Sequence, residues 1–355
     1  MVAGDAHALR RARAAAQLLH RPRAVGVAEL LARMLAVQAQ DLRAARLALR
    51  ARATGLAAAD VDVALTDERS VMVAWLMRGT LHLVGRDDYP WLLGLTAPTR
   101  LSTSRRRLGQ EGVSPDDAER AVKIVERALA DAGPLTRPEL AERIAAKGIR
   151  TEGQATPHLL LLAALRGIAV LGPLRDDGAH AFVLVRDWLG APPPTEFEGP
   201  DRDAALAELA RRYLTGHGPA APADLAAWSG LPLRDARAGL SAIASELAQR
   251  DDDLVDLAAR DRPPDAIPPR LLPAFDPYLL GWKDRSFAVA SAHAKRVHPG
   301  GGMLRATATV DGLAVGTWSA AGGVVELELF VPIASAAQAA LRHDAADVAR
   351  FVQAP

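Results

Sequence analysis

The fold is decided by the stretch GPLTRPELA at residues 133–141 and by its echo GPAAPADLA at residues 218–226. Both begin with Gly-Pro, and both carry an acidic residue, Leu and Ala at the same offset from it. Proline favours the first turn of a helix, because it lacks an N–H that this turn would leave unbonded. Each stretch therefore predicts the start of a helix, and the pair indicates an internal repeat.

The residues after each copy continue the same pattern. A helical run and then strand-like runs follow, at residues 156–166, 169–171 and 182–185, and again at 233–249 and 254–257. Helix, turn, helix and two-stranded wing is the order of a winged helix, a variant of the helix-turn-helix. Residues 24–84 have this order too, without the Gly-Pro opening. Chance Gly-Pro dipeptides before helices are the alternative, and we favour a true repeat.

The rest of the chain shows linkers and a β-rich end. Proline-rich segments at residues 191–194 and 262–269 are typical of linkers. Asp311-Gly312 predicts the tight turn of a hairpin, and a strand and an amphipathic helix follow at 324–331 and 334–352. We expect four segments: an N-terminal helix with a first winged helix (1–115), a second winged helix (116–195), a third (196–265), and a β-segment with the C-terminal helix (266–355).

The composition is that of an ordinary globular protein, with 355 residues, of which 50% are hydrophobic and 24% charged. Cysteine is absent, which excludes a disulfide scaffold, a thiolate nucleophile and cysteine-ligated metal sites. The 43 basic and 42 acidic residues nearly cancel, so the chain is not uniformly basic. Only four of the basic residues are lysine, and arginine binds phosphates and guanines with a two-pronged geometry that lysine lacks. A local nucleic-acid surface therefore remains open.

Common cofactor and membrane signals are missing. The sequence has no Walker A motif and no G-x-G-x-x-G, H-E-x-x-H or G-x-S-x-G motif, and its nine histidines are scattered. We therefore expect no cofactor and no metal. No signal peptide is evident, and the longest apolar stretch, residues 159–174, is interrupted by Arg166 and Pro173. These features predict a cytoplasmic protein.

The first candidate site is Gln38-Ala39-Gln40, which interrupts a helical pattern. Asp41 is a plausible N-cap for a helix over residues 42–52. In an extended lead-in to that helix, the two glutamine side chains can point the same way and together hold a water molecule. The ordinary alternative is a pair of glutamines that are solvated or contact phosphates.

The second candidate is a predicted strand over residues 75–84. Arg78, Thr80 and His82 would fall on one face of it, beside Trp75, and a polar triple between apolar neighbours suits a pocket wall. The alternative is that these three residues form the solvent-exposed face of an antiparallel sheet.

Two further stretches carry candidate DNA-binding residues. Residues 271–285 concentrate aromatic and charged side chains, with Phe275, Asp276 and Arg285 as candidates. This segment can cover a nucleic-acid cleft, or it can be a plug that joins the β-rich end to the helical part, which its chemistry favours. The other stretch contains hydroxyl side chains and the arginines Arg100, Arg105, Arg106 and Arg107. These side chains can bind phosphate oxygens, and the alternative is that they form an ordinary solvated face.

Together these segments resemble the AlkZ-like family of winged-helix DNA glycosylases. The resemblance is carried by LAVQAQD at 35–41, RGTLH at 78–82, LLPAFD at 271–276 and the Gly-Gly hairpin after residue 300. It implies a mainly α fold with β wings (α+β), made of tandem winged-helix repeats in a C-shape plus a small C-terminal β-barrel. It also implies excision of N7-alkylated purines, including interstrand crosslinks, from double-stranded DNA, with Gln38 and Gln40 as the catalytic pair. Related members carry Gln-x-Asp instead.

The chemistry of such a reaction suits two neutral amides. Alkylation at N7 makes the purine a cation, so the base leaves without being protonated. The enzyme then has to stabilise an oxocarbenium-like sugar and place a water near its anomeric carbon. Lys283 is the only lysine in a candidate segment, and nothing marks it as an activated amine, so we expect a monofunctional glycosylase. Whether the base is flipped out or read in an open groove stays open.

We expect a monomer that binds double-stranded DNA with alkylated or crosslinked purines, is associated with the nucleoid and does not bind membranes. One alternative is a non-enzymatic winged-helix regulator, which would usually bind paired half-sites as a dimer. Another is a protein that sequesters a genotoxic natural product, for which a closed apolar pocket without basic residues is expected.

Overall fold

The computed structural model describes residues 3–20, 24–175, 177–194, 196–250, 253–321 and 324–353. The chain packs as two units, with Met1–Val61, Leu206–Trp228 and Pro232–Pro355 in unit 1 and with Asp62–Ala205 and Ser229–Leu231 in unit 2. The four segments expected from sequence are finer than these units and stay a prediction. Among the described helices, none has the length and apolar character needed to cross a membrane.

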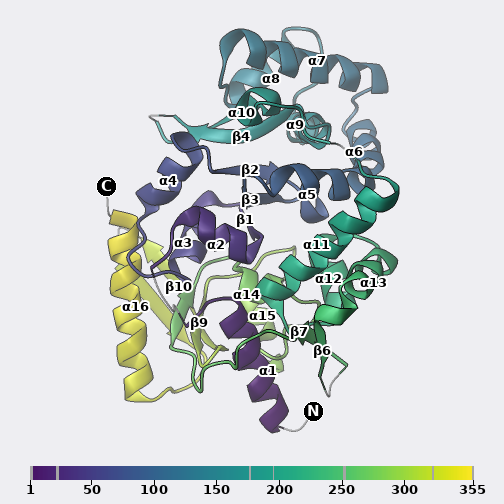
Figure 1. Ribbon diagram of the computed structural model, residues 1–355. Helices are drawn as coiled ribbons and strands as arrows, with labels where there is room; N and C mark the ends of the chain where they lie inside the picture. Colours follow the sequence, from purple (N-terminus) through teal and green to yellow (C-terminus); the bar gives the residue numbers. More distant parts are fainter. Residues whose placement is uncertain are drawn as a thin grey trace. The chain divides into compact units, whose positions relative to one another are not determined.

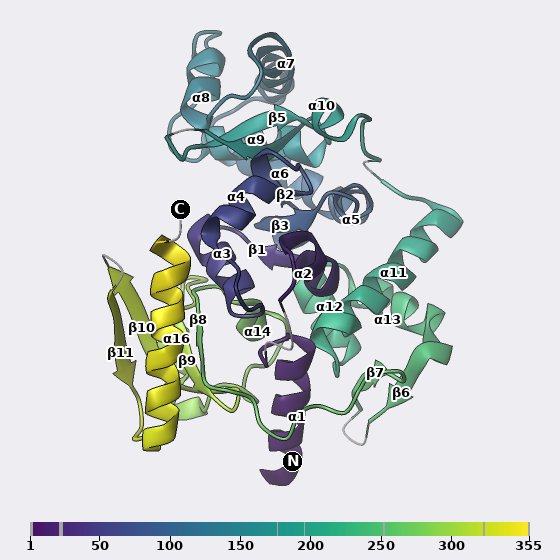
Figure 2. The same cartoon turned by 60° about the vertical axis from the view of Figure 1, so that its left-hand side comes forward.

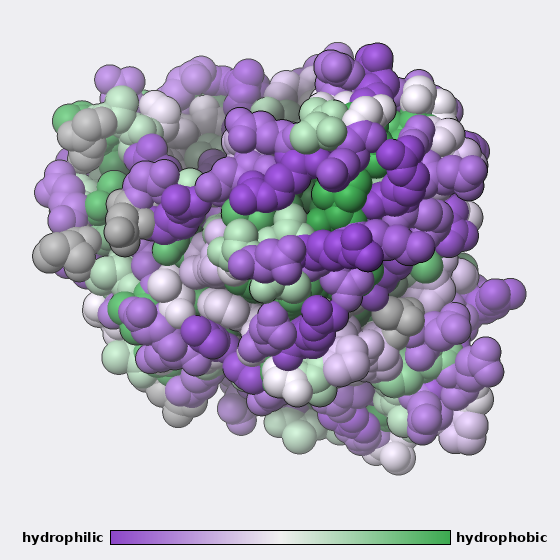
Figure 3. All heavy atoms as spheres, turned by 90° about the horizontal axis from the view of Figure 1, so that it is seen from above, coloured by the Kyte–Doolittle hydropathy of each residue, from purple (hydrophilic) through white to green (hydrophobic). Residues whose placement is uncertain are grey.

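Unit 2 contains an antiparallel sheet packed with helices (Figure 1). The strands β3 (Leu81–Gly85), β2 (Val71–Trp75), β4 (Ala169–Leu174) and β5 (His180–Leu184) are hydrogen-bonded in that order. The helices are α5 (Tyr89–Thr96), α6 (Pro98–Gln110), α7 (Pro115–Ala132), α8 (Arg137–Ala145), α9 (Ala155–Leu165) and α10 (Val185–Leu189). Helix α9 packs against β2, β4, α6 and α7, so its leucine-rich sequence is buried. The face seen from above is mostly hydrophilic, and a patch of apolar side chains lies between rows of hydrophilic ones (Figure 3).

The two Gly-Pro stretches are each part of the same order of elements. In the first copy α7, α8 and α9 precede the β4–β5 hairpin. In the second copy α11 (Gly199–His217), α12 (Pro222–Ser229) and α13 (Leu233–Ala242) precede a hairpin of β6 (Leu247–Gln249) and β7 (Val255–Leu257). Leu135 forms a β-bridge with Phe182, and Ala220 forms one with Val255. Each lies two positions after the glycine of its Gly-Pro pair, and each pairs with the second strand of the hairpin that follows. The two copies therefore share backbone pairing as well as element order.

Two details of the predicted pattern are wrong. The helix expected to run to residue 249 ends at Ala242, because Leu247–Gln249 pairs with β7 and obtains its backbone hydrogen bonds there. The single strand expected over 75–84 is a hairpin, in which Trp75 faces Leu81 across β2 and β3. Its turn is a 3-10 helix, Met77–Gly79, with φ of 57° at Arg78 and 73° at Gly79. Glycine adopts that left-handed conformation at no steric cost, and it lets the chain reverse where alternation suggested one strand.

Unit 1 combines the helical N-terminus with the β-rich C-terminus. Its N-terminal part contains α1 (Ala3–Ala16), α2 (Val27–Met34), β1 (Ala36–Gln38) and α3 (Leu42–Arg50), and α4 (Ala58–Thr66) crosses the border into unit 2. The short helices α14 (Pro277–Leu280) and α15 (Ala294–Val297) lie between the linker after β7 and the C-terminal sheet. The predicted helix after Asp41 is present, and over residues 24–84 the helices α2, α3 and α4 precede the β2–β3 hairpin.

The C-terminal sheet has four antiparallel strands in the order β11 (Val324–Leu329), β10 (Leu313–Ala321), β9 (Thr307–Val310) and β8 (Arg270–Leu272). The predicted hairpin turn at Asp311-Gly312 is confirmed, since both residues have positive φ. The expected barrel is wrong for the described residues, because β8 and β11 end the strand order and do not pair with each other. Instead α16 (Ser335–Gln353) packs against β8 and β11 and lies alongside the sheet (Figures 1 and 2).

The core of unit 1 contains two fully buried arginines at the end of α3. The Arg52 guanidinium donates to both carboxylate oxygens of Asp276 at 2.9 and 2.8 Å, and to the amide oxygen of Gln17 at 2.8 Å. Arg50 donates to Asp344 of α16 at 3.2 Å and to the carbonyl of Leu271 at 2.8 Å. These bonds attach α1, α16 and the segment around residue 276 to one helix.

We predict that Arg52→Met lowers the free energy of unfolding by about 3–5 kcal/mol, since it leaves the Asp276 carboxylate buried without its cation. Arg262→Met is the control, because the Arg262–Asp265 pair is 90% and 95% exposed and contributes under about 1 kcal/mol. The double variant Arg52→Met/Asp276→Leu should regain part of the loss. Urea denaturation of the four proteins measures this, and equal losses in Arg52→Met and Arg262→Met would contradict it.

Candidate functional site

Gln38 and Gln40 lie in an extended segment between two helices of unit 1. The chain leaves α2 at Leu35, whose φ of 65° turns it sharply into β1. Val37 and Ala39 are buried, whereas Gln38 is half-buried and Gln40 is exposed, which is the alternation of an extended chain. The two amides therefore lie on the more open side of the segment.

Asp41 fixes the position where this segment ends. Its carboxylate accepts hydrogen bonds from the backbone N–H of Arg43 at 2.9 Å and of Ala44 at 3.3 Å, so it caps α3 as the sequence predicts. The far end of α3 is held by the buried Arg50 and Arg52. Helix α3 is thus fixed at both ends, and the glutamines precede its cap directly.

Four of the predicted DNA-binding arginines line one cavity in unit 2, which we call the arginine cavity. Its volume is about 300 Å³, and it is lined by Arg78, Gly79, Arg100, Thr103, Ser104, Arg106, Arg107, Gln110, His158 and Leu161. The arginines come from the β2–β3 turn and from α6, and His158 and Leu161 come from α9. Arg105 does not line it. The sequence singled out the arginines, but not His158, because only the packing of α6 on α9 brings that histidine close.

Gly230 allows two of these arginines to approach the chain. It has a φ of 75°, and a Cβ atom there would lie 2.5 Å from the Arg100 guanidinium and 3.0 Å from the backbone nitrogen of Arg78. Arg100 donates to the Gly230 carbonyl at 3.5 Å. Any larger residue at 230 would push the β2–β3 turn and Arg100 apart.

The other candidates of the β2–β3 hairpin are placed differently. Trp75 is buried and stacks on Phe182, with ring centroids 6.0 Å apart. Thr80 donates to the Met77 carbonyl at 3.1 Å within the turn. His82 is only 2% exposed, and its Nδ1 lies 2.9 Å from the Thr80 carbonyl. Burial, with a smaller contribution from Arg78, lowers the pKa of His82 from 6.5 to about 3. His82 is therefore a neutral core residue near pH 7.

The candidates from residues 271–285 lie in unit 1. Asp276 is fully buried, bonded to Arg52, and caps α14 through the Tyr278 N–H at 2.9 Å. Phe275 and Arg285 are half-buried, and Arg285 donates to the Leu279 carbonyl at 2.5 Å. Burial lowers the pKa of Arg285, and Asp284 partly offsets this. Asp276 is therefore a core residue, whereas Phe275 and Arg285 are partly exposed.

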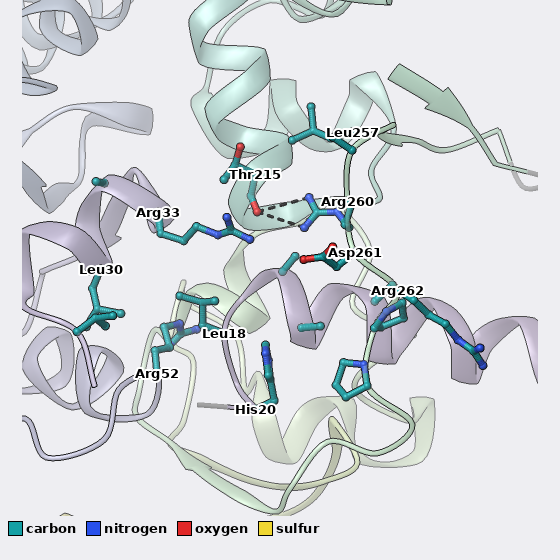
Figure 4. Close-up of a pocket in the computed structure, with 18 of the residues that line it drawn as sticks. Leu18, His20, Leu30, Arg33, Arg52, Thr215, Leu257, Arg260, Asp261 and Arg262 are labelled. Carbon is teal, nitrogen blue, oxygen red and sulfur yellow. Dashed lines mark hydrogen bonds between the residues drawn. The ribbon is translucent and has the colours of Figure 1, made fainter. Parts of the chain in front are cut away.

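A larger cavity of about 700 Å³ lies in unit 1, and no sequence pattern predicted it. Small residues of α1 line it together with Arg33 and with residues 257–264 of the linker after β7. In Figure 4, Arg33 and Asp261 extend toward each other from opposite sides, and Arg260 is bonded to the Thr215 carbonyl at 3.4 Å. Because Glu29 and Asp261 line it with the arginines, this cavity has mixed charge. Neither cavity is lined by Gln38 or Gln40.

Metal ligands are not gathered anywhere in the described part of the chain, which has no group of three or more His, Asp and Glu side chains suited to a metal ion.

Comparisons with known proteins point to one family. The family model described as DNA glycosylase AlkZ-like matches residues 31–351. A curated relative, the interstrand DNA cross-link repair glycosylase of Streptomyces sahachiroi, is 29% identical over 281 residues, which is 74% of this chain and 72% of that protein. The solved structure of Streptomyces sahachiroi DNA glycosylase AlkZ aligns with a TM-score of 0.77 at 25% identity, covering 97% of this chain and 96% of that one.

We predict that Asp41→Ala lowers the free energy of unfolding by about 1 kcal/mol, because two backbone N–H groups of α3 lose their acceptor. Asp41→Asn should lose much less, since asparagine is an equally good cap. Thermal or urea unfolding compares the two variants. If both lose the same amount, the charge of Asp41 rather than its capping bonds stabilises α3.

We also predict acid destabilisation through His82. The unfolded chain takes up a proton at His82 near pH 6.5, whereas the folded chain does so only near pH 3, so stability falls as the pH falls through this window. The slope from one group reaches at most about 1.4 kcal/mol per pH unit. Urea unfolding between pH 7 and pH 4.5 should give a shallower pH dependence for His82→Gln. The exposed His343 provides the control His343→Gln, and identical slopes in all three proteins would refute the prediction.

Proposed function

The chain belongs to the AlkZ-like DNA glycosylase family, and from this premise we propose that it excises N7-alkylated purines, including those of interstrand crosslinks, from double-stranded DNA. The observation that carries the proposal is the family match over residues 31–351, a range that includes Gln38, Gln40 and the arginines of α6. The name of the curated relative, an interstrand DNA cross-link repair glycosylase, supports the crosslink as a substrate.

The proposed reaction uses Gln38 and Gln40 as the catalytic residues. The bond between the sugar C1′ and the purine nitrogen breaks, and its electron pair neutralises the cationic alkylated base. A water oxygen then bonds to C1′ and releases its proton to solvent. The amide oxygens of the two glutamines accept hydrogen bonds from this water and stabilise the positive charge that develops on the sugar. Neutral amides suffice, because the leaving base needs no proton.

The exposure of the glutamine segment supports an open reaction site. Gln40 is exposed and Gln38 half-buried, and neither lines the arginine cavity or the larger cavity of unit 1. A crosslinked base is tied to the opposite strand, so it cannot easily enter a closed pocket. An open site is compatible with such a bulky lesion.

We further propose that the repeated helix-helix-hairpin segments are winged-helix units that hold the duplex, and that the protein acts as a monomer associated with the nucleoid. The shared bridges of Leu135 and Ala220 support this, since a winged helix has a strand at that position. Phosphate contacts come from Arg100, Arg105, Arg106 and Arg107, all on α6.

We predict that Gln38→Ala/Gln40→Ala slows base release at least about 100-fold, because each lost dipole typically costs about 10² to 10³ in rate. The assay incubates the protein with duplex DNA that contains N7-methylguanine or an interstrand crosslink and measures the free base. The wild type should leave an intact abasic strand, as expected for water attack without a lysine adduct.

The matched control is Gln338→Ala, which removes an exposed glutamine on α16 and should leave the rate unchanged. Circular dichroism checks that both variants are folded, and binding to undamaged duplex should change less than about 5-fold. The proposal fails if the wild type releases no base or if the double variant releases it at the wild-type rate.

A further inference from the structure

The arginine cavity is lined by cationic and neutral polar groups, and no carboxylate lines it. Arg100, Ser104 and Arg107 lie three or four residues apart on α6, so they share one face of the helix. Glu111 is the nearby acid in sequence, and it pairs with Arg107 at 2.8 Å. The charge inside the cavity is therefore strongly positive in the absence of a ligand.

Ser104 is placed as a donor without an acceptor. It is 4% exposed, and its buried Oγ makes no hydrogen bond to any residue in the described ranges. A serine inside a helix commonly bonds to the carbonyl four residues earlier, and Ser104 does not. Buried hydroxyls are rarely left unbonded in proteins, so this one indicates a ligand atom that completes it.

Two further groups at the cavity have unused hydrogen-bonding capacity. The buried Nδ1 of His158 has no partner among the described residues. Burial, together with the positive charge of Arg107, lowers the pKa of His158, and Glu111 offsets this only in part, so the neutral ring can donate one N–H. The Arg106 side chain forms no hydrogen bond or ion pair within the part of the chain that the structure describes.

We propose that the arginine cavity is a binding site for a single phosphate group, held by Arg106, Ser104 and His158 with the other arginines around it. A guanidinium matches phosphate oxygens with two parallel hydrogen bonds, and hydroxyl and imidazole donors complete a tetrahedral anion. Ser104 belongs to the hydroxyl-rich arginine stretch that the sequence indicated, whereas His158 comes from α9 and was not indicated. The shared chemistry is a phosphate oxyanion, and its assignment to the DNA backbone rests on the proposed function.

Isothermal titration with inorganic phosphate tests the site, against chloride at equal ionic strength. The wild type should bind phosphate, and Arg106→Gln and Ser104→Ala should each weaken binding about 10-fold. Arg127→Gln is the matched control, because Arg127 is an exposed arginine on α7 that does not line the cavity and has no role in the proposed DNA contacts. It should change phosphate affinity less than about 2-fold. Ser104→Ala removes an unbonded hydroxyl and Arg106→Gln an unpaired exposed side chain, so both variants should fold.

A competition experiment then identifies the source of the phosphate. If undamaged duplex DNA displaces phosphate from the wild type, the cavity binds a backbone phosphodiester, and Arg106→Gln should reduce the slope of log affinity against log salt by about 0.9. If duplex leaves phosphate binding unaltered, the ligand is a free phosphate or a phosphomonoester.

The proposal is overturned if the wild type binds no phosphate, or if Arg106→Gln and Ser104→Ala bind it as well as Arg127→Gln does. Base release plays no part in these measurements. A protein that binds phosphate here but releases no alkylated base refutes only the proposed glycosylase reaction.

Discussion

The buried pair of Arg52 and Asp276 is the interaction on which unit 1 depends. Both side chains are fully withdrawn from solvent, so each charge is tolerated only because the other is bonded to it at 2.8 and 2.9 Å. Gln17 extends the contact, since its amide bonds Arg52 and also the carbonyl of Gly216 at 2.6 Å. Four distant parts of the chain are thus joined at one point. The pair also fixes the end of α3, and the Asp41 cap fixes its start, directly after Gln38 and Gln40.

Arginine has two separate roles in this protein. In unit 1, Arg50 and Arg52 are buried and bonded to carboxylates, so they add nothing to the surface charge. In unit 2, Arg106 and its neighbours line a cavity that no carboxylate enters. The net charge of +1 counts all 43 basic and 42 acidic residues, so it does not distinguish the paired, buried arginines from those that line the cavity. A near-neutral protein can therefore bind a polyanion, because a ligand responds to the local field and not to the total.

The repeat shows how far local sequence determines structure. Gly-Pro followed by an acidic residue, Leu and Ala begins a helix in both copies. The equal bridges of Leu135 and Ala220 show that the likeness extends to backbone pairing. The second wing was predicted less well. Its first strand, β6, has a sequence that continues a helix pattern, and only the hydrogen bonds from β7 make it a strand.

Signals that act within a few residues could be read from the sequence alone. The Asp41 cap, the Asp311-Gly312 turn and the C-terminal helix follow from capping, turn geometry and periodicity, each satisfied by near neighbours. The Gln-x-Gln segment and the α6 arginines were found in the same way, as chemistry-bearing residues in a row. Only the tertiary structure decided that Asp276 and His82 are core residues, and that Ser104 and His158 meet the arginines at one cavity. The reason is that burial and charge pairing depend on partners far along the chain, as Arg52 does on Asp276, and no local pattern records those partners.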